Sequence, residues 1–170
     1  MKKSMPWIRC AGFLVGLAVI LGICDFCFAP SGYVRFSLHE VTRKDPQYDT
    51  IILGASHARS AINPEYLDEE LGTNTLNLAI PGETVKDAYY LLKDACESND
   101  VKTVIMDVDY QYWMDEQPQG YFTEPFICQN ITNLKVKTEY LLDNWDTIDL
   151  RNVLVRRLSW DCTWSSVKQN

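Results

Sequence analysis

Apolar residues are concentrated at the start of the chain, where residues 11–24 (AGFLVGLAVILGIC) contain no charged side chain. Counted from Trp7, the apolar stretch has about twenty residues, close to the length that a helix needs to cross a bilayer. Because Lys2, Lys3 and Arg9 precede it, we expect a single-pass protein with a cytoplasmic amino terminus and an extracytoplasmic body in the cell membrane. Residues 1–30 are therefore predicted to form a basic tip and a transmembrane signal anchor.

Two other interpretations of this segment stay open at the level of the sequence. A basic start, an apolar centre and the triplet Cys27-Phe28-Ala29 also resemble a signal peptide that is cleaved after export. Residues 21–24 (LGIC) loosely resemble a lipoprotein cleavage box, although Ile23 is bulkier than the small residue expected there. The retained anchor is the interpretation that the length of the apolar core favours.

From residue 50 onward, short apolar runs alternate with segments that carry signals for helix starts and ends. After a polar segment at residues 31–48, which we expect to be a stalk or linker, apolar runs typical of buried strands lie at residues 50–53, 75–78 and 104–108. Helices are predicted at residues 64–71 and 84–96, from the start Asn63-Pro64-Glu65, the stop at Gly72, and a capping box of Thr84 and Asp87. This order predicts an α/β fold with a parallel sheet and flanking helices, at residues 49–170.

The remainder of the chain is less regular. Residues 109–126 are rich in aromatic and acidic residues and in Gly and Pro, and we expect a long loop over the carboxyl edge of the sheet. Residues 133–158 suggest one or two amphipathic helices. Because three strands make a thin parallel sheet, we expect either that another chain completes it or that the sequence continues into a longer protein.

Charge and cysteine spacing exclude several classes of function. The formal net charge is −7, which repels phosphate backbones, so we expect no nucleic acid partner. The six cysteines show no CxxC spacing, and no glycine-rich nucleotide motif occurs, so we expect no metal and no cofactor. Asp107 and Asp109 share one strand face, and with Asp115 and Glu116 they either bind a cation or form a solvated acidic loop.

Candidate chemistry lies where the three predicted strands end. In open α/β sheets, ligands bind at the carboxyl ends of the strands. Three segments follow those ends: Gly54-Ala55-Ser56-His57, residues 77–84 (NLAIPGET), and Asp107-Val108-Asp109. A serine in such a position needs a partner that removes its proton before it acts as a nucleophile.

These three segments together resemble the front half of the SGNH (GDSL-type) hydrolases. Residues 52–84 (ILGASHARSAINPEYLDEELGTNTLNLAIPGET) are similar to membrane-anchored bacterial members that act on cell-envelope polymers, such as alginate-type O-acetyltransferase proteins and D-alanine transfer proteins. The resemblance implies an SGNH/flavodoxin-like fold, here incomplete. It implies an envelope polysaccharide or an acyl-donor membrane protein as partner, and these site residues: Ser56 as nucleophile, the amides of Ser56 and Gly82 as oxyanion donors, Asp109 where the family usually has asparagine, and His57, Asn77 and Thr84 around the pocket.

The sequence departs from the family at the general base. The family supplies its Asp and His from a DxxH motif near the carboxyl terminus, whereas this chain has only His39 and His57, preceded three positions earlier by Phe36 and Gly54. We therefore expect an extracytoplasmic domain related to O-acyl or acetyl transfer or ester hydrolysis that is inactive alone. The alternative is a non-catalytic, anchored interaction module of an envelope assembly complex.

Overall fold

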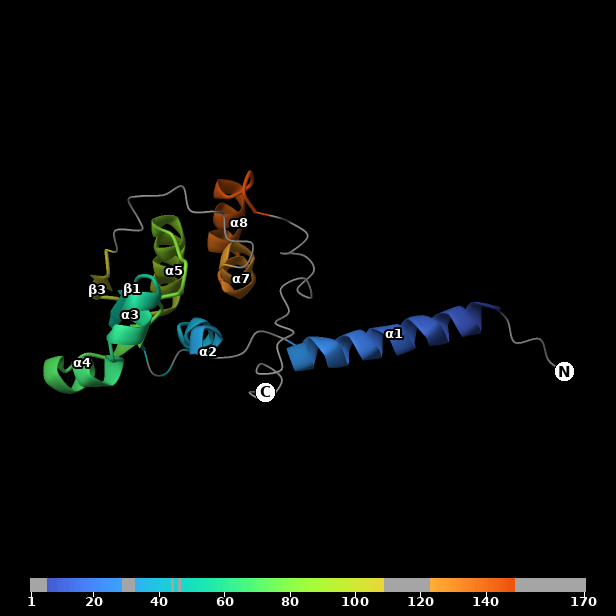
Figure 1. Cartoon of the computed structure of the whole chain (residues 1–170), viewed down its shortest axis with the longest axis horizontal. Coiled ribbons are helices and arrows are strands. Elements are labelled where there is room, and N and C mark those ends of the chain that lie inside the picture. The colour runs from blue at the N-terminus through green and yellow to red at the C-terminus, as the bar shows by residue number, and fades with distance from the viewer. Residues whose placement is uncertain (1–5, 29–32, 44, 46, 109–122, 149–170) are drawn as a thin grey trace.

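A computed structural model of the chain describes residues 6–28, 33–43, 45, 47–108 and 123–148. The first element is α1 (Pro6–Phe28), which stands apart from the other helices and strands (Figure 1). Within it, the 19 residues Pro6–Cys24 form a helix that is long and apolar enough to cross a membrane, and none of that stretch is buried against the body. The coarse prediction of one N-terminal helix of membrane-spanning length is confirmed.

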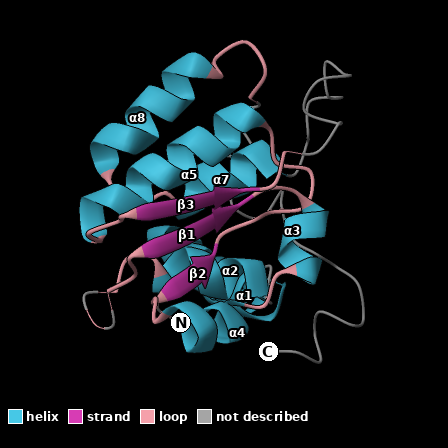
Figure 2. Cartoon of the chain, turned by 90° about the vertical axis from the view of Figure 1, so that its left-hand side faces the viewer, coloured by secondary structure: helices cyan, strands magenta, loops and turns pink. Residues whose placement is uncertain are grey.

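The body is built on a parallel sheet of three strands in the order β2-β1-β3. β1 (Thr50–Leu53) lies in the middle, with β2 (Thr75–Asn77) and β3 (Thr103–Met106) on either side (Figure 2). All four residues of β1 are buried, because both its edges and both its faces are covered. The three strands lie where the sequence predicts them, with boundaries that differ by one or two residues, so the α/β class with a parallel sheet is confirmed.

Helices cover both faces of this sheet (Figure 2). On one face, Ile52 packs with Ala58 and Ala79, beneath α3 (Ser56–Ala61) and α4 (Pro64–Leu71). On the other face lies a larger core that includes Ile51 and Leu53. Its helices are α2 (Tyr33–Glu40), α5 (Val85–Ser98), α7 (Thr123–Asn130) and α8 (Leu134–Asp143).

The capping signals read from the sequence form in the structure. The Asn63 side chain accepts a hydrogen bond from the Glu65 amide at the start of α4, and Gly72 closes that helix with φ +67°. Thr84 and Asp87 form a complete capping box at the start of α5. These local contacts fix the boundaries of both helices without help from distant parts of the chain.

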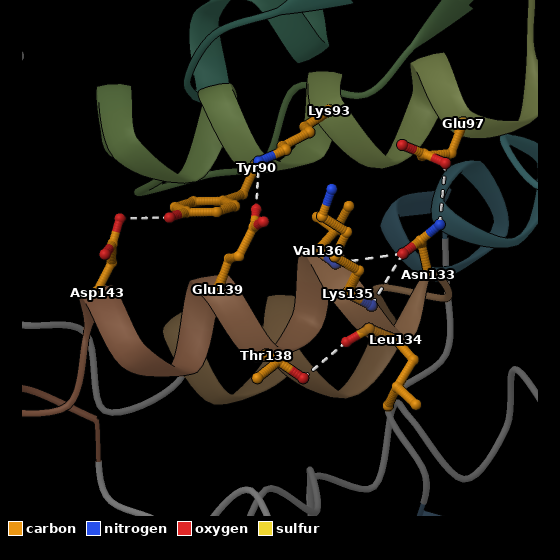
Figure 3. A network of polar contacts seen from close by, with 10 residues as sticks. All are labelled: Tyr90, Lys93, Glu97, Asn133, Leu134, Lys135, Val136, Thr138, Glu139 and Asp143. Atoms are coloured by element: carbon orange, nitrogen blue, oxygen red, sulfur yellow. Dashed lines mark hydrogen bonds and ion pairs between the residues drawn. The ribbon is translucent and has the colours of Figure 1, made fainter.

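Polar contacts hold α8 against α5 (Figure 3). The Asp94 carboxylate on α5 is buried, and its two oxygens accept hydrogen bonds from the amides of Thr132 (3.1 Å) and Asn133 (2.9 Å), just before α8 begins. Three side-chain pairs continue the contact along the two helices: Tyr90 with Asp143, Lys93 with Glu139, and Glu97 with Asn133.

β3 is uncovered on one side. Val104 and Met106 pair in register with Ile51 and Leu53 of β1, so their side chains belong to the face of the larger core. Yet they are 43% and 37% exposed, whereas their β1 partners are 0% and 2% exposed. The described helices therefore leave this face of β3 partly exposed.

The structure differs from the sequence predictions in three segments. The predicted loop at residues 109–126 is wrong at its end, because α7 begins at Thr123 and buries Phe126, Ile127 and Cys128 in the larger core. The range expected to be a linker contains α2, whose end contributes Leu38 and Val41 to the same core. The third difference is α3, a six-residue helix that no capping signal predicted.

Candidate functional site

Hydrogen bonds between neighbouring strands continue beyond the ends of the strands, so the three candidate segments start from a common frame. The Leu78 amide donates to the Ile52 carbonyl (2.9 Å), and the Ile80 amide donates to the Gly54 carbonyl (3.1 Å). On the other side of β1, the Asp107 amide donates to the Leu53 carbonyl (3.0 Å). The carboxyl ends of all three strands therefore meet at one edge of the sheet, as predicted.

Gly54 is the residue that lets the chain turn out of β1. Its φ is +145°, a conformation that residues with a side chain rarely adopt. A Cβ atom at this position would lie only 2.8 Å from the Cβ atoms of both Ala58 and Asp107. Glycine is thus required for two reasons, the backbone angle and the close approach of α3 and the end of β3.

Ser56 is the first residue of α3 and is exposed to solvent, directly beyond the carboxyl end of the central strand. Ala55 occupies the N-cap and supplies no capping side chain. His57 is exposed and follows Ser56 on the same helix, where successive side chains point about 100° apart. Ser56 therefore presents an exposed hydroxyl directly beyond the end of the central strand, and the side chain of His57 leaves the helix in a different direction.

Glu83 connects the loop after β1 to the loop after β2. Its side chain is 1% exposed, and its two oxygens accept hydrogen bonds from the amides of Gly54 (2.8 Å) and Ile80 (2.9 Å). Burial raises the pKa of Glu83 to about 8, against the lowering effect of the two amides, and the nearby Asp87 adds to the rise. The sequence analysis did not identify this residue, because a glutamate after Pro81-Gly82 is typical of an exposed turn.

Gly82 lies in a tight turn between β2 and α5. The Glu83 amide donates to the Ile80 carbonyl (3.0 Å), Pro81 occupies the second position, and Gly82 has φ +77° in the third, as in a type II turn. A Cβ atom on Gly82 would lie 3.5 Å from the hydroxyl oxygen of Thr123 at the start of α7. Gly82 is exposed, and the Glu83 contacts tie its turn to the segment before Ser56.

Asn77 and Thr84, both predicted to lie around the pocket, make contacts within the scaffold. The amide nitrogen of the buried Asn77 side chain donates to the carbonyls of Ala58 (3.1 Å) and Ile62 (3.3 Å), and its oxygen accepts from the Ala79 amide. Asn77 thereby fastens β2 to α3. Thr84 caps α5 through Asp87.

A second buried polar group lies at the amino end of α5. The Asp87 carboxylate accepts hydrogen bonds from the Tyr140 hydroxyl (2.7 Å) and from the backbone and side chain of Thr84 (2.8 and 2.9 Å). Burial raises the pKa of Tyr140, and the charge on Asp87 raises it further. Burial also raises the pKa of Glu124 on α7, again with a contribution from Asp87. The group joins α5 to α8.

Several predicted residues do not take part in the described geometry. Asp109, Asp115 and Glu116 lie outside the described residues, whereas Asp107 is half-buried beside Gly54. Within the part of the chain that the structure describes, no group of three or more His, Cys, Asp or Glu side chains is placed to hold a metal ion. His39 is exposed on α2, which packs on the face of the sheet opposite α3.

With this geometry in hand, we compared the chain with known proteins. Comparisons with protein-family models, with curated proteins and with solved structures find no match. The α/β fold, the helix of membrane-spanning length and the placement of Ser56 are therefore established by the chain's own structure.

Proposed function

We propose that this chain is a membrane-anchored, extracytoplasmic α/β domain of SGNH type, in which Ser56 is the acyl nucleophile of O-acyl transfer or ester hydrolysis on cell-envelope polymers. In this proposal α1 crosses the membrane with its basic end in the cytoplasm. The observation that carries it is the position of Ser56, an exposed hydroxyl at the start of a helix, directly after the buried central strand.

The loops around Ser56 support this chemistry. Gly54 brings the chain out of β1 in a sharp turn, and Glu83 ties the same turn to the loop that contains Gly82. During attack on an ester, the Ser56 oxygen forms a bond to the carbonyl carbon and the carbonyl oxygen becomes an oxyanion. We propose that the backbone amides of Ser56 and Gly82 stabilise that oxyanion. The leaving alcohol takes a proton, and a water molecule or a sugar hydroxyl then removes the acyl group from the serine.

In this proposal the proton of Ser56 passes to an acceptor other than the two histidines of the chain. His57 is the next residue on the same short helix, and His39 is on a helix that packs against the other face of the sheet. We therefore propose that the base comes from a partner protein in the membrane. On its own, the 170-residue chain is then inactive.

The test compares the chain in its native membrane with the same chain after purification. The full chain, carrying an affinity tag, is treated in both settings with a fluorophosphonate probe that reacts with activated serines, and the labelled residue is mapped by peptide mass spectrometry. We expect labelling of Ser56 in the native membrane and none after purification. Ser56→Ala should abolish the labelling, whereas Ser60→Ala, which changes an exposed serine on the same helix, should preserve it.

Two outcomes contradict the proposal in different ways. Strong labelling of the purified chain at Ser56 would show that the chain contains a base of its own. An absence of labelling in both settings would remove Ser56 from catalysis and favour the alternative of a non-catalytic interaction module, for which the uncovered edge of β3 offers a surface.

A further inference from the structure

The Glu83 side chain connects the two candidate loops through hydrogen bonds. The carboxylate bridges the amides of Gly54 and Ile80, and the Ile80 amide also donates to the Gly54 carbonyl. Gly54 lies two residues before Ser56, and Ile80 lies two residues before Gly82. The separation of the Ser56 loop and the Gly82 turn is therefore set, in part, by the width of one carboxyl group.

Burial raises the pKa of Glu83 to about 8, and above that pH the ionised carboxyl group offers an acceptor oxygen to each of the two amides. A carboxylate offers two acceptor oxygens, whereas the amide of glutamine offers one acceptor and one donor. Glutamine at this position would turn an N–H group toward one of the two backbone N–H groups. The Ile80 amide keeps the Gly54 carbonyl as an acceptor, but the Gly54 amide has no second acceptor among the contacts of the described residues, and because the site is buried we expect glutamine to shift the loop before Ser56.

The charged neighbours of Glu83 come from several elements. Asp87 on α5 is the charged group that acts on it directly and disfavours its ionisation. Glu124 on α7 is coupled to Asp87 in turn. Asp107, at the end of β3, lies beside Gly54, and His57 lies on α3. Asp87 therefore opposes a negative charge on Glu83, whereas the amides of Gly54 and Ile80 favour it.

We propose that Glu83 is a positioning residue, which sets the distance between the Ser56 loop and the Gly82 turn through the two backbone amides that its carboxylate binds. This inference deepens the proposed function and rests on it, since the two loops supply the nucleophile and the oxyanion donors of one reaction. Glu83 itself touches no reacting atom. Loss of one of the two acceptor oxygens of Glu83 should increase the distance between the two loops without unfolding the body.

The first test needs no catalytic activity. In the full ¹⁵N-labelled chain in detergent micelles, the amide proton resonances of Gly54 and Ile80 are followed from pH 5 to pH 9. We expect both to move downfield together with one midpoint near 8, because ionisation of Glu83 strengthens both hydrogen bonds. Glu83→Gln should abolish the titration of both amides, and Glu69→Gln, an exposed glutamate on α4, should leave it unchanged.

Resonances of Gly54 and Ile80 that stay fixed with pH, or that titrate with different midpoints, would overturn the inference. The wild-type titration decides this even if Glu83→Gln fails to fold.

The second test separates this inference from the proposed function. In native membranes at pH 9, above the pKa of Glu83, Glu83→Gln should slow fluorophosphonate labelling of Ser56 by about tenfold or more, as expected when a nucleophile is misplaced by a fraction of an ångström, whereas Glu69→Gln should label at the wild-type rate. If Ser56 is labelled equally fast in Glu83→Gln at every pH, the positioning role is wrong and the proposed function stands. If Ser56 is not labelled in the wild-type chain, the proposed function fails, and the titration of the Gly54 and Ile80 amides still tests the role of Glu83.

Discussion

Replacing Gly54 with alanine is the sharpest test of the turn that presents Ser56. The new Cβ would lie 2.8 Å from the Cβ atoms of Ala58 and Asp107, a separation that real Cβ atoms essentially never show. The backbone angle of +145° adds strain, which costs about 1–3 kcal/mol for a residue with a side chain. Overpacking by one methyl group in a tightly packed site costs a further 1–3 kcal/mol, roughly.

Together these effects predict a loss of about 2–6 kcal/mol in the free energy of unfolding, a large part of the total stability of a domain of this size. Urea denaturation of the full chain in detergent micelles, followed by tryptophan fluorescence, measures the change. Gly72→Ala is the matched control, because Gly72 also has a positive φ (+67°) but nothing lies within 4 Å of the added atom. Its loss should be about 1–2 kcal/mol, from backbone strain alone. Equal losses in the two variants would refute the argument from close contact.

Three further predictions follow from contacts described above. Asp94→Asn should lower the free energy of unfolding by about 1–3 kcal/mol in urea denaturation, because one of the amides of Thr132 and Asn133 loses its acceptor; an unchanged midpoint would contradict this. Glu83 has a pKa raised from 4.5 to about 8 by burial, so the folded state binds its proton more tightly than the unfolded state does. Its contribution to stability should be complete below pH 4.5 and fall as the pH rises through 8, and Glu83→Gln should remove that part of the pH dependence. Deletion of residues 1–29 should release the chain from the membrane pellet on ultracentrifugation, and a truncated chain that stays in the pellet would indicate a second membrane-binding surface.

The sequence predicts those parts of the fold that form through contacts between residues close together in the chain. The start at Asn63, the stop at Gly72 and the capping box of Thr84 and Asp87 each form through contacts within a few residues. The continuous apolar residues of β1 follow from burial on both faces. In such segments, propensity, capping and burial all favour the same structure, so the pattern is sufficient.

The parts that the sequence does not predict depend on distant contacts. α7 forms in a segment whose proline and acidic residue suggest a loop, because Phe126, Ile127 and Cys128 complete a core built by other elements. The role of Glu83 is hidden for the same reason, since its two acceptor contacts are set by where the β1 and β2 loops meet. The resemblance implied Asn77 at the pocket, and the contacts of its side chain with the carbonyl groups of Ala58 and Ile62 likewise depend on segments distant in the sequence.

The central position of β1 determines how the candidate nucleophile responds to fluctuations of the fold. Local opening starts where few contacts hold the chain, at an uncovered edge such as β3 or at a peripheral helix such as α8. β1 is hydrogen-bonded to a strand on each side, and Ser56 follows it after only two residues. Fraying at the periphery therefore leaves in place the strand that leads into Ser56.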